Sequence, residues 1–193
     1  MPKSKSGSGP KAQPLAIELL MADHRTVEDL FEQYESEKES DEDTRRAIAG
    51  QICGELTVHA QVEEEIFYPW LRENLDELEM LEEAYVEHNA AKALIAQIEA
   101  ADEIDDAYNA KVKVLGEYIK HHVKEEEQEI FPEIRSKKDE LDELGQEIAA
   151  RKGELMEELG LGAEESEEED DEADSEQPPG KSRSRESTQR EPR

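Results

Sequence analysis

A metal site with nitrogen and oxygen ligands is the chemistry that the histidines and two of the glutamates of this chain suit best. The six residues are His24, His59, Glu63, His88, His122 and Glu126. Each of the two glutamates follows a histidine by four residues, a spacing that places both side chains on one face of a helix. Imidazole and carboxylate together favour iron or manganese over metals that prefer thiolates.

The positions of the histidines predict that all four lie at one level of a helical bundle. The midpoints between successive histidines fall in or beside three polar breaks, at 39–43, 72–74 and 102–106. In an up-down-up-down bundle, a residue lies level with its partner when both are equally far from the turn that joins their helices. The four imidazoles and two carboxylates are therefore expected to form one layer.

Apolar residues that recur every three or four positions predict the helices that carry this layer. The stripes cover four stretches, Pro14 to about Tyr34, Thr44 to Trp70, Leu75 to Ala101 and Asp105 to Arg135. Either Asp43 or Thr44 is expected to cap the second helix. The fold class that follows is all-α, an antiparallel up-down-up-down four-helix bundle over residues 14–136.

The flanking segments have compositions of their own. Residues 1–13 predict a disordered leader, because Ser, Gly, Lys and Pro offer too little apolar surface to pack. Residues 137–160 predict a C-terminal amphipathic helix that lies against the bundle, with a break near Gly145 or Gly153 left open. Residues 161–193 predict a disordered acidic tail with a basic end.

An internal repeat supports the bundle. His24 and His88 each follow an acidic residue and lie 64 residues apart, while His59 and His122 lie 63 apart. His59 and His122 are each followed by Glu at the fourth position and Pro at the tenth. The chain thus reads as two duplicated helical hairpins, and duplication of a half-site predicts a two-metal site.

Other interpretations of these residues were weighed as well. One such histidine alone is typical of a half-buried core position, but burial of six polar groups in one layer would cost several kcal/mol per unpaired charge. Haem bound by two histidines is disfavoured because it would not use Glu63 or Glu126 as ligands. Structural zinc is disfavoured because such sites rarely have six ligands.

Several residues near the layer are assigned simpler roles. His121 is expected at the surface or behind the ligands, and Cys53 as a small hydrophobe. A solvated rim with room for one auxiliary ligand is predicted for Glu64, Glu65, Glu125 and Glu127. Core packing is predicted for Tyr34, Tyr85, Tyr108 and Tyr118, with the alternative that one hydroxyl faces a bound oxygen species.

Charge and composition narrow the classes of partner. A net charge of −30 with 39% charged residues argues against nucleic acid and anionic membranes as partners, because phosphate binding needs Lys and Arg surfaces. The single cysteine cannot form an internal disulfide, and no secretory signal or 18-residue apolar run is present. These features predict a cytoplasmic protein, and the acidic tail is a possible site for a basic protein partner.

The pattern of His24, His59-x-x-x-Glu63, His88 and His122-x-x-x-Glu126 resembles the hemerythrin-like family, also called the HHE cation-binding domain, over about residues 14–160. The resemblance implies a non-haem di-iron centre in an antiparallel four-helix bundle. It implies that His24 and His59 serve one iron, that His88 and His122 serve the other, and that Glu63 and Glu126 bridge them. Two departures stand out: oxygen carriers of the family have a further His where this chain has Lys92, and an Asp one position after the place of Glu126.

The functional expectation is therefore a cytoplasmic di-iron protein that binds, senses or reacts with dioxygen, peroxide or nitric oxide. With four imidazoles rather than five, the resemblance favours reaction, sensing or iron release over reversible oxygen storage. One alternative is a di-iron enzyme with catalase-like or nitric-oxide-reducing activity. A second alternative is an iron-buffering or interaction protein with a structural metal site.

Overall fold

The computed structural model describes residues 14–76 and 78–161, and helices make up nearly all of this part of the chain. The α-helices are α1 (Leu15–Ser36), α2 (Glu42–Val62), α3 (Tyr68–Asn74), α4 (Glu79–Glu99), α5 (Asp106–Glu125), α6 (Phe131–Ile134) and α7 (Lys138–Glu158). Two π-helical segments, η1 (Glu63–Phe67) and η2 (Glu126–Ile130), join α2 to α3 and α5 to α6. The predicted leader (1–13) lies outside the described residues, as does the predicted tail from residue 162 onward.

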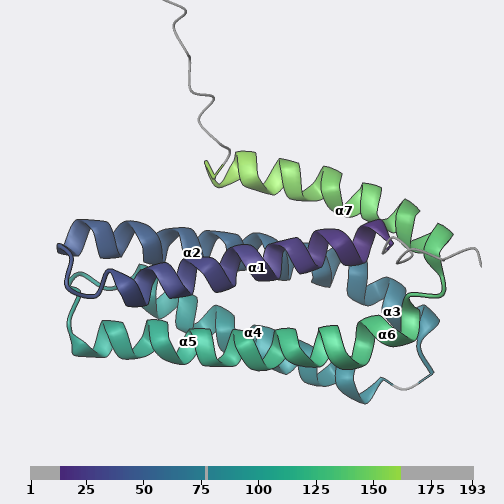
Figure 1. The fold of residues 1–193 in the computed structure, drawn as a ribbon, viewed down its shortest axis with the longest axis horizontal. Coiled ribbons are helices and arrows are strands. Elements are labelled where there is room, and N and C mark those ends of the chain that lie inside the picture. The colour runs from purple at the N-terminus through teal and green to yellow at the C-terminus, as the bar shows by residue number, and fades with distance from the viewer. Residues whose placement is uncertain (1–13, 77, 162–193) are drawn as a thin grey trace, which may run out of the picture. The chain divides into compact units, whose positions relative to one another are not determined.

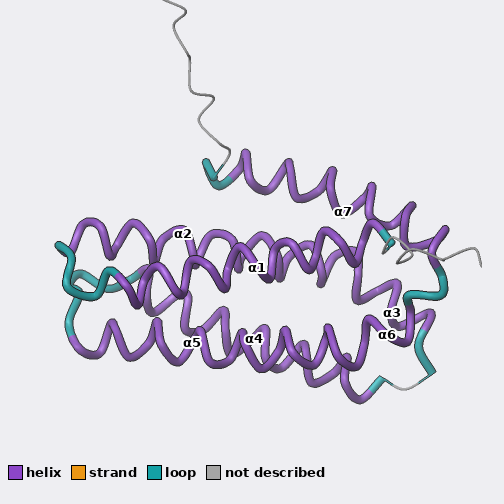
Figure 2. The backbone as a smooth tube through the Cα atoms, in the orientation of Figure 1, coloured by secondary structure: helices purple, strands orange, loops and turns teal. Residues whose placement is uncertain are grey.

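The helices form the predicted bundle, so the predicted fold class is confirmed. Antiparallel α1 and α2 lie together above α4 and α5, and α7 lies along the outer side of α1 and α2 (Figure 1). The turns that join α1 to α2 and α4 to α5 are at one end, and α3 and α6 are at the other (Figure 2). Among the described residues, no helix combines the length and the apolar character needed to cross a membrane.

Side-chain caps and loop packing move two helix starts away from the predicted positions. Asp41, rather than Asp43 or Thr44, caps α2, and its carboxylate accepts a hydrogen bond of 3.0 Å from the backbone N–H of Thr44. The helix predicted from Leu75 begins instead at Glu79. Leu75 is extended, and both Leu75 and Leu78 pack on the core from the connecting loop, so their apolar character belongs to the loop.

The π-helical segments were not predicted, and they change the register of the helix ends. Both begin at the glutamates of the metal-site pattern and precede the prolines at 69 and 132. A proline cannot donate to the helix ladder, and its ring clashes with the carbonyl four residues earlier, so a wider turn relieves the conflict. As a result Phe67 and Tyr68 are fully buried, whereas Ile66 and Trp70, the predicted stripe residues, are only partly buried.

Helix α7 is continuous, without the break considered near Gly145 or Gly153. It is closely attached to α1: a Cβ atom added at Gly145 would lie 2.6 Å from the backbone nitrogen of Ala16. Asp142 accepts a 2.8 Å hydrogen bond from the backbone N–H of Leu15, which satisfies one free donor at the start of α1. Gly145 is therefore the residue that lets the two helices approach.

Candidate metal centre

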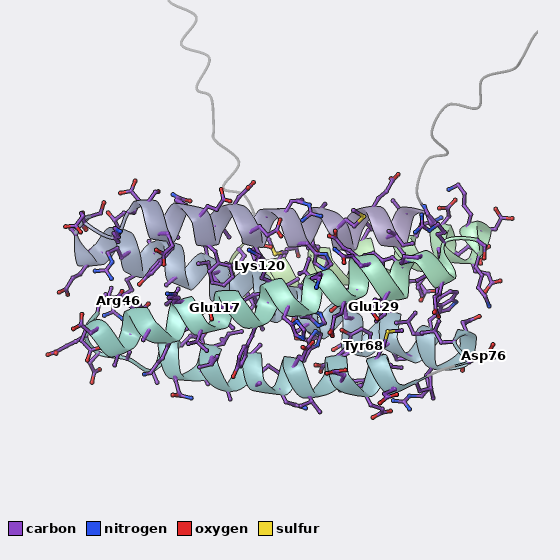
Figure 3. The ribbon with its side chains drawn as sticks, turned by 60° about the horizontal axis from the view of Figure 1, so that its bottom comes forward. Arg46, Tyr68, Asp76, Glu117, Lys120 and Glu129 are labelled. Atoms are coloured by element: carbon purple, nitrogen blue, oxygen red, sulfur yellow. The ribbon has the colours of Figure 1, made fainter. Side chains whose placement is uncertain are left out.

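The structure brings all six predicted residues together in one buried layer of the bundle. They come from α1, α2, η1, α4, α5 and η2, one residue from each. The exposed fractions are 0% for Glu63, 1% for Glu126 and 5% or less for the four histidines. The layer separates two apolar core clusters, one toward α3, α6 and α7 and the other toward the two turns of the bundle. Tyr68 lies between Arg46, near one end, and Asp76, near the other (Figure 3).

The donor atoms form two groups that share Glu63. The first group holds His24, His59, Glu63 and Glu126, and the second holds Glu63, His88 and His122, each with its donor atoms within 4.8 Å of one another. Oε2 of Glu63 lies 3.3 Å from Nε2 of both His59 and His88. Glu126 belongs to the first group only, and its role as a second bridging carboxylate stays a prediction.

Several donor atoms of the layer face the interior with no hydrogen-bond partner among the described residues. These atoms are Nε2 of His24, Nε2 of His59, Oε1 of Glu63 and Oε2 of Glu126. Buried polar atoms without partners are rare in folded proteins because each costs free energy. A cation among the inward-facing nitrogens and oxygens would satisfy them, so the side chains present fit a metal.

A carboxylate stands behind each histidine on the outer side of the layer. Nδ1 of His24 lies 3.0 Å from Glu127, and Nδ1 of His88 lies 3.1 Å from Glu64. Nδ1 of His122 lies 3.0 Å from Glu87, and Nδ1 of His59 lies 3.6 Å from Asp23. A carboxylate acceptor keeps the proton on Nδ1 and leaves Nε2 free for a metal, and it also fixes the ring plane.

Sequence reasoning missed these outer carboxylates. Glu64 and Glu127 were predicted as a solvated rim with one possible ligand, whereas each contacts a histidine and is only partly exposed. The signal was present in the repeat, because both follow the central glutamates by one residue and Asp23 and Glu87 both precede a histidine. Glu65 does lie on the surface, where it pairs with Arg151.

Tyr68 is a further member of the site that sequence reasoning did not single out. Its hydroxyl lies 3.3 Å from Oε2 of Glu63, 3.3 Å from Oε1 of Glu126 and 3.2 Å from Nε2 of His88. The π-turn places it there, since a residue five positions after Glu63 returns to the same face of the wider helix. Phe131, its counterpart in the repeat, has no hydroxyl and stacks on His24 with 6.1 Å between ring centroids.

The remaining residues considered from the sequence lie away from the centre. The hydroxyl of Tyr34 donates to Asn109, and Tyr118 is 47% exposed. Cys53 is buried in the apolar core, as predicted. His121 is exposed, as predicted, and its Nε2 lies 3.2 Å from Glu125.

Charge compensation sets the protonation of the layer. Burial lowers the pKa of His24, but hydrogen bonds to Glu126 and Glu127 outweigh it and raise this pKa to about 9. Burial likewise opposes the charge on His122, yet Glu126 and Glu63 hold its pKa well above the usual value. The pKa of Glu63 stays well below its usual value despite burial, because His59, His122 and His88 surround it. Protons thus occupy His24 and His122 in the metal-free centre.

A small cavity adjoins the histidines on the side of the two turns. It has a volume of about 20 Å³ and is lined by all four histidines together with apolar side chains and Lys92. A cavity of this size admits about one water-sized molecule. Lys92, at the position where the family's oxygen carriers have a histidine, directs its Nζ to Glu64 at 2.6 Å rather than to the centre.

Comparison with known proteins agrees with the fold and the site. The hemerythrin HHE cation-binding domain family matches residues 15–134. The chain is also 30% identical over 145 residues to a protein of Nostoc sp. named DNA nickase, across 74% of this chain and 40% of that protein. The chain therefore spans less than half the length of this relative. No solved structure gives a significant match.

The family match runs from the start of α1 to the end of α6 and includes every residue of the buried layer. The His and Glu clusters within it form a site suited to a metal. This chain belongs to the hemerythrin HHE cation-binding domain family.

Proposed function

We propose that this chain is a non-haem di-iron protein whose buried centre binds or reacts with dioxygen, hydrogen peroxide or nitric oxide. The observation that carries the proposal is the sharing of Glu63 between two groups of inward-facing donors. A carboxylate common to two groups is the arrangement that holds two cations close together. The ligands proposed are His24, His59, Glu63, His88, His122 and Glu126.

The donor set supports iron as the metal. Four imidazoles and two carboxylates are nitrogen and oxygen ligands of the kind that non-haem iron uses, and Cys53 belongs to neither donor group. Bound iron would supply one-electron chemistry toward small oxidants. Two structural features then restrict what reaches it: the centre is almost fully buried, and the adjoining cavity holds about one water-sized molecule.

Residues around the centre have roles that follow from their contacts. The phenol of Tyr68 is a hydrogen-bond donor on the carboxylate side of the layer, opposite to the cavity. The apolar cavity walls, including Leu56 and Ile119, exclude bulk water from the histidine side. The outer carboxylates keep the histidine Nε2 atoms directed inward.

Metal content and absorption spectra test this proposal. We expect two irons per chain in the wild type, with ferric absorption that bleaches on anaerobic reduction and returns on exposure to oxygen. His59→Ala and His122→Ala should each lose most of the iron, because each removes a ligand. Lys124→Ala is the matched control, since this exposed residue of α5 pairs with no described member of the layer and should leave the iron content unchanged. A His59→Ala/His122→Ala protein that retained two irons, or a wild type with a single zinc, would refute the di-iron site.

Turnover distinguishes a di-iron enzyme from a binder or sensor. Steady consumption of hydrogen peroxide or nitric oxide by the iron-loaded wild type, absent in His122→Ala, would assign catalase-like or nitric-oxide-reducing activity. A single stoichiometric spectral change with no further consumption would assign binding or sensing.

The name of the Nostoc relative suggests another activity, but we propose that this centre does not act on DNA. A phosphodiester in a duplex cannot enter a cavity of about 20 Å³, and a net charge of −30 repels phosphates. Iron-loaded protein should therefore leave supercoiled plasmid intact when peroxide is removed. Nicking that persists under those conditions and disappears in His122→Ala would overturn this view.

A further inference from the structure

A lysine whose side chain is 26% exposed interrupts the apolar stripe of α7. The apolar stripe of this helix consists of Leu141, Leu144, Ile148 and Leu155, with exposed fractions between 0% and 7%. Lys152 lies one helical turn after Ile148 and one before Leu155, on the same stripe. An amphipathic helix normally has an apolar residue at such a position, so the ammonium needs a specific partner.

The partner of Lys152 is an acidic residue next to the metal centre. Nζ of Lys152 donates to Oδ1 of Asp23, a side chain of α1 that is only 6% exposed and precedes His24. The other oxygen of Asp23 lies 3.6 Å from Nδ1 of His59 on α2. Three helices are thus connected in series, from α7 through α1 to a histidine of the centre.

The same arrangement recurs behind the other histidines. Each outer carboxylate pairs with a basic side chain: Glu127 with Arg25, Glu64 with Lys92, Glu87 with His121 and Asp23 with Lys152. Three of these four bases lie within residues 15–134, the range of the family match. Lys152 lies beyond it, so one histidine depends on a helix that the family match does not include.

We propose that Lys152 is a positioning residue of the metal centre, which holds Asp23 so that this carboxylate orients His59. The inference rests on the metal centre proposed above and adds that α7 controls one of its two metal positions. That position is the one formed by His24 and His59 with Glu63 and Glu126. The position of His88 and His122 has no contact of this kind with α7.

The physical reason is the cost of an uncompensated buried charge. Without the ammonium, the carboxylate of Asp23 turns toward solvent. Nδ1 of His59 then loses the carboxylate that faces it at 3.6 Å and orients the ring. Loss of such an outer partner typically weakens metal binding about 10- to 100-fold.

Anaerobic titration with Co²⁺ tests the inference on the full-length protein. We expect wild type to bind two equivalents. Lys152→Met should keep one equivalent at wild-type affinity and bind the other at least about 10-fold more weakly. Lys152→Arg should restore the second equivalent, because the guanidinium can still pair with Asp23. Arg151→Met is the matched control, since this neighbour on α7 pairs with Glu65 and Glu154 on the surface.

Proton NMR of the cobalt form separates positioning from simple docking of α7. The ring N–H of His59, identified by its absence in His59→Ala, should exchange with water faster in Lys152→Met, while the other imidazole N–H signals are unchanged. Equal weakening of both equivalents together with lost helicity would overturn the inference in favour of docking alone. Two unchanged equivalents in Lys152→Met would also overturn it, whereas a wild type that binds no cobalt would refute the metal centre itself.

Discussion

At the scale of single residues, the centre is a set of opposite charges that compensate one another whether or not a metal is bound. Among the described residues, no Lys or Arg pairs with the buried Glu63 or Glu126, so in the metal-free protein protons on His24 and His122 balance them. A bound metal would take the place of those protons at Nε2, and the outer Nδ1 contacts would remain. Proton and metal therefore compete for the same atoms.

This competition predicts opposite pH dependences for the metal-free and metal-loaded protein. The pKa of His24 rises from 6.5 to about 9 on folding, so its contribution to stability is complete below pH 6.5 and is lost as pH rises to about 9. The lowered pKa of Glu63 gives a contribution that is present above pH 4.5 and is lost in acid. Thermal unfolding midpoints of the chelator-treated protein should thus fall between pH 6.5 and 9.

The metal-loaded protein should gain stability over the same range, because deprotonated histidines bind metal more tightly. Lys124→Ala, at an exposed position of α5, serves as a control that should leave both profiles unchanged. A metal-free midpoint that stays level or rises from pH 6.5 to 9 would show that protons do not hold the layer together.

At the scale of elements, two local departures from regular helix packing shape the centre. The π-turns at η1 and η2 begin at Glu63 and Glu126 and bring Tyr68 and Phe131 onto the centre. The contact at Gly145 lets α7 approach α1 closely enough for Lys152 to reach Asp23. Each depends on a residue that cannot be replaced freely, proline after the π-turns and glycine in α7.

The glycines of α7 provide a matched pair of substitutions. Gly145→Ala should lower the free energy of unfolding by about 1–3 kcal/mol, because its Cβ would meet the backbone of Ala16 at 2.6 Å. Gly153→Ala, which meets no atom within 4 Å, should raise it by about 0.5–1 kcal/mol through helix propensity. Urea unfolding measures both, and an equal effect of the two substitutions would contradict the close contact of α7 with α1.

At the scale of the whole molecule, net charge opposes folding. A net charge of −30 repels itself in the compact state more than in an expanded one. Exposed ion pairs such as Arg25 with Glu28 offset little of this, because surface pairs contribute about 0–1 kcal/mol. Salt should therefore weaken the repulsion between like charges by more free energy than it removes from the surface ion pairs.

Salt is accordingly expected to stabilise the protein. Raising sodium chloride from about 0.01 M to about 0.1 M shortens the screening length from about 30 Å to about 10 Å. The thermal unfolding midpoint of the metal-free protein should increase by about 2–4 °C for each kcal/mol of repulsion removed. A midpoint that falls with added salt would show that ion pairs outweigh the repulsion.

The sequence by itself determined the helices, their antiparallel order and the residues that meet at the centre. These properties depend on local periodicity and on the distance of each residue from a turn, and both can be read along one dimension. The repeat of His59 and Glu63 in His122 and Glu126 made the prediction specific. Only the boundaries of the second and third helices shifted, where a cap and a loop competed with helix periodicity.

Only the tertiary structure decided what surrounds the centre. The π-turns changed which face of the helix ends is buried, so Tyr68 rather than another tyrosine reaches the glutamates. The pairing of Lys152 with Asp23 joins residues 129 positions apart. Contacts of this kind arise from how side chains of separate helices pack, and the spacing of residues within one helix carries no information about them.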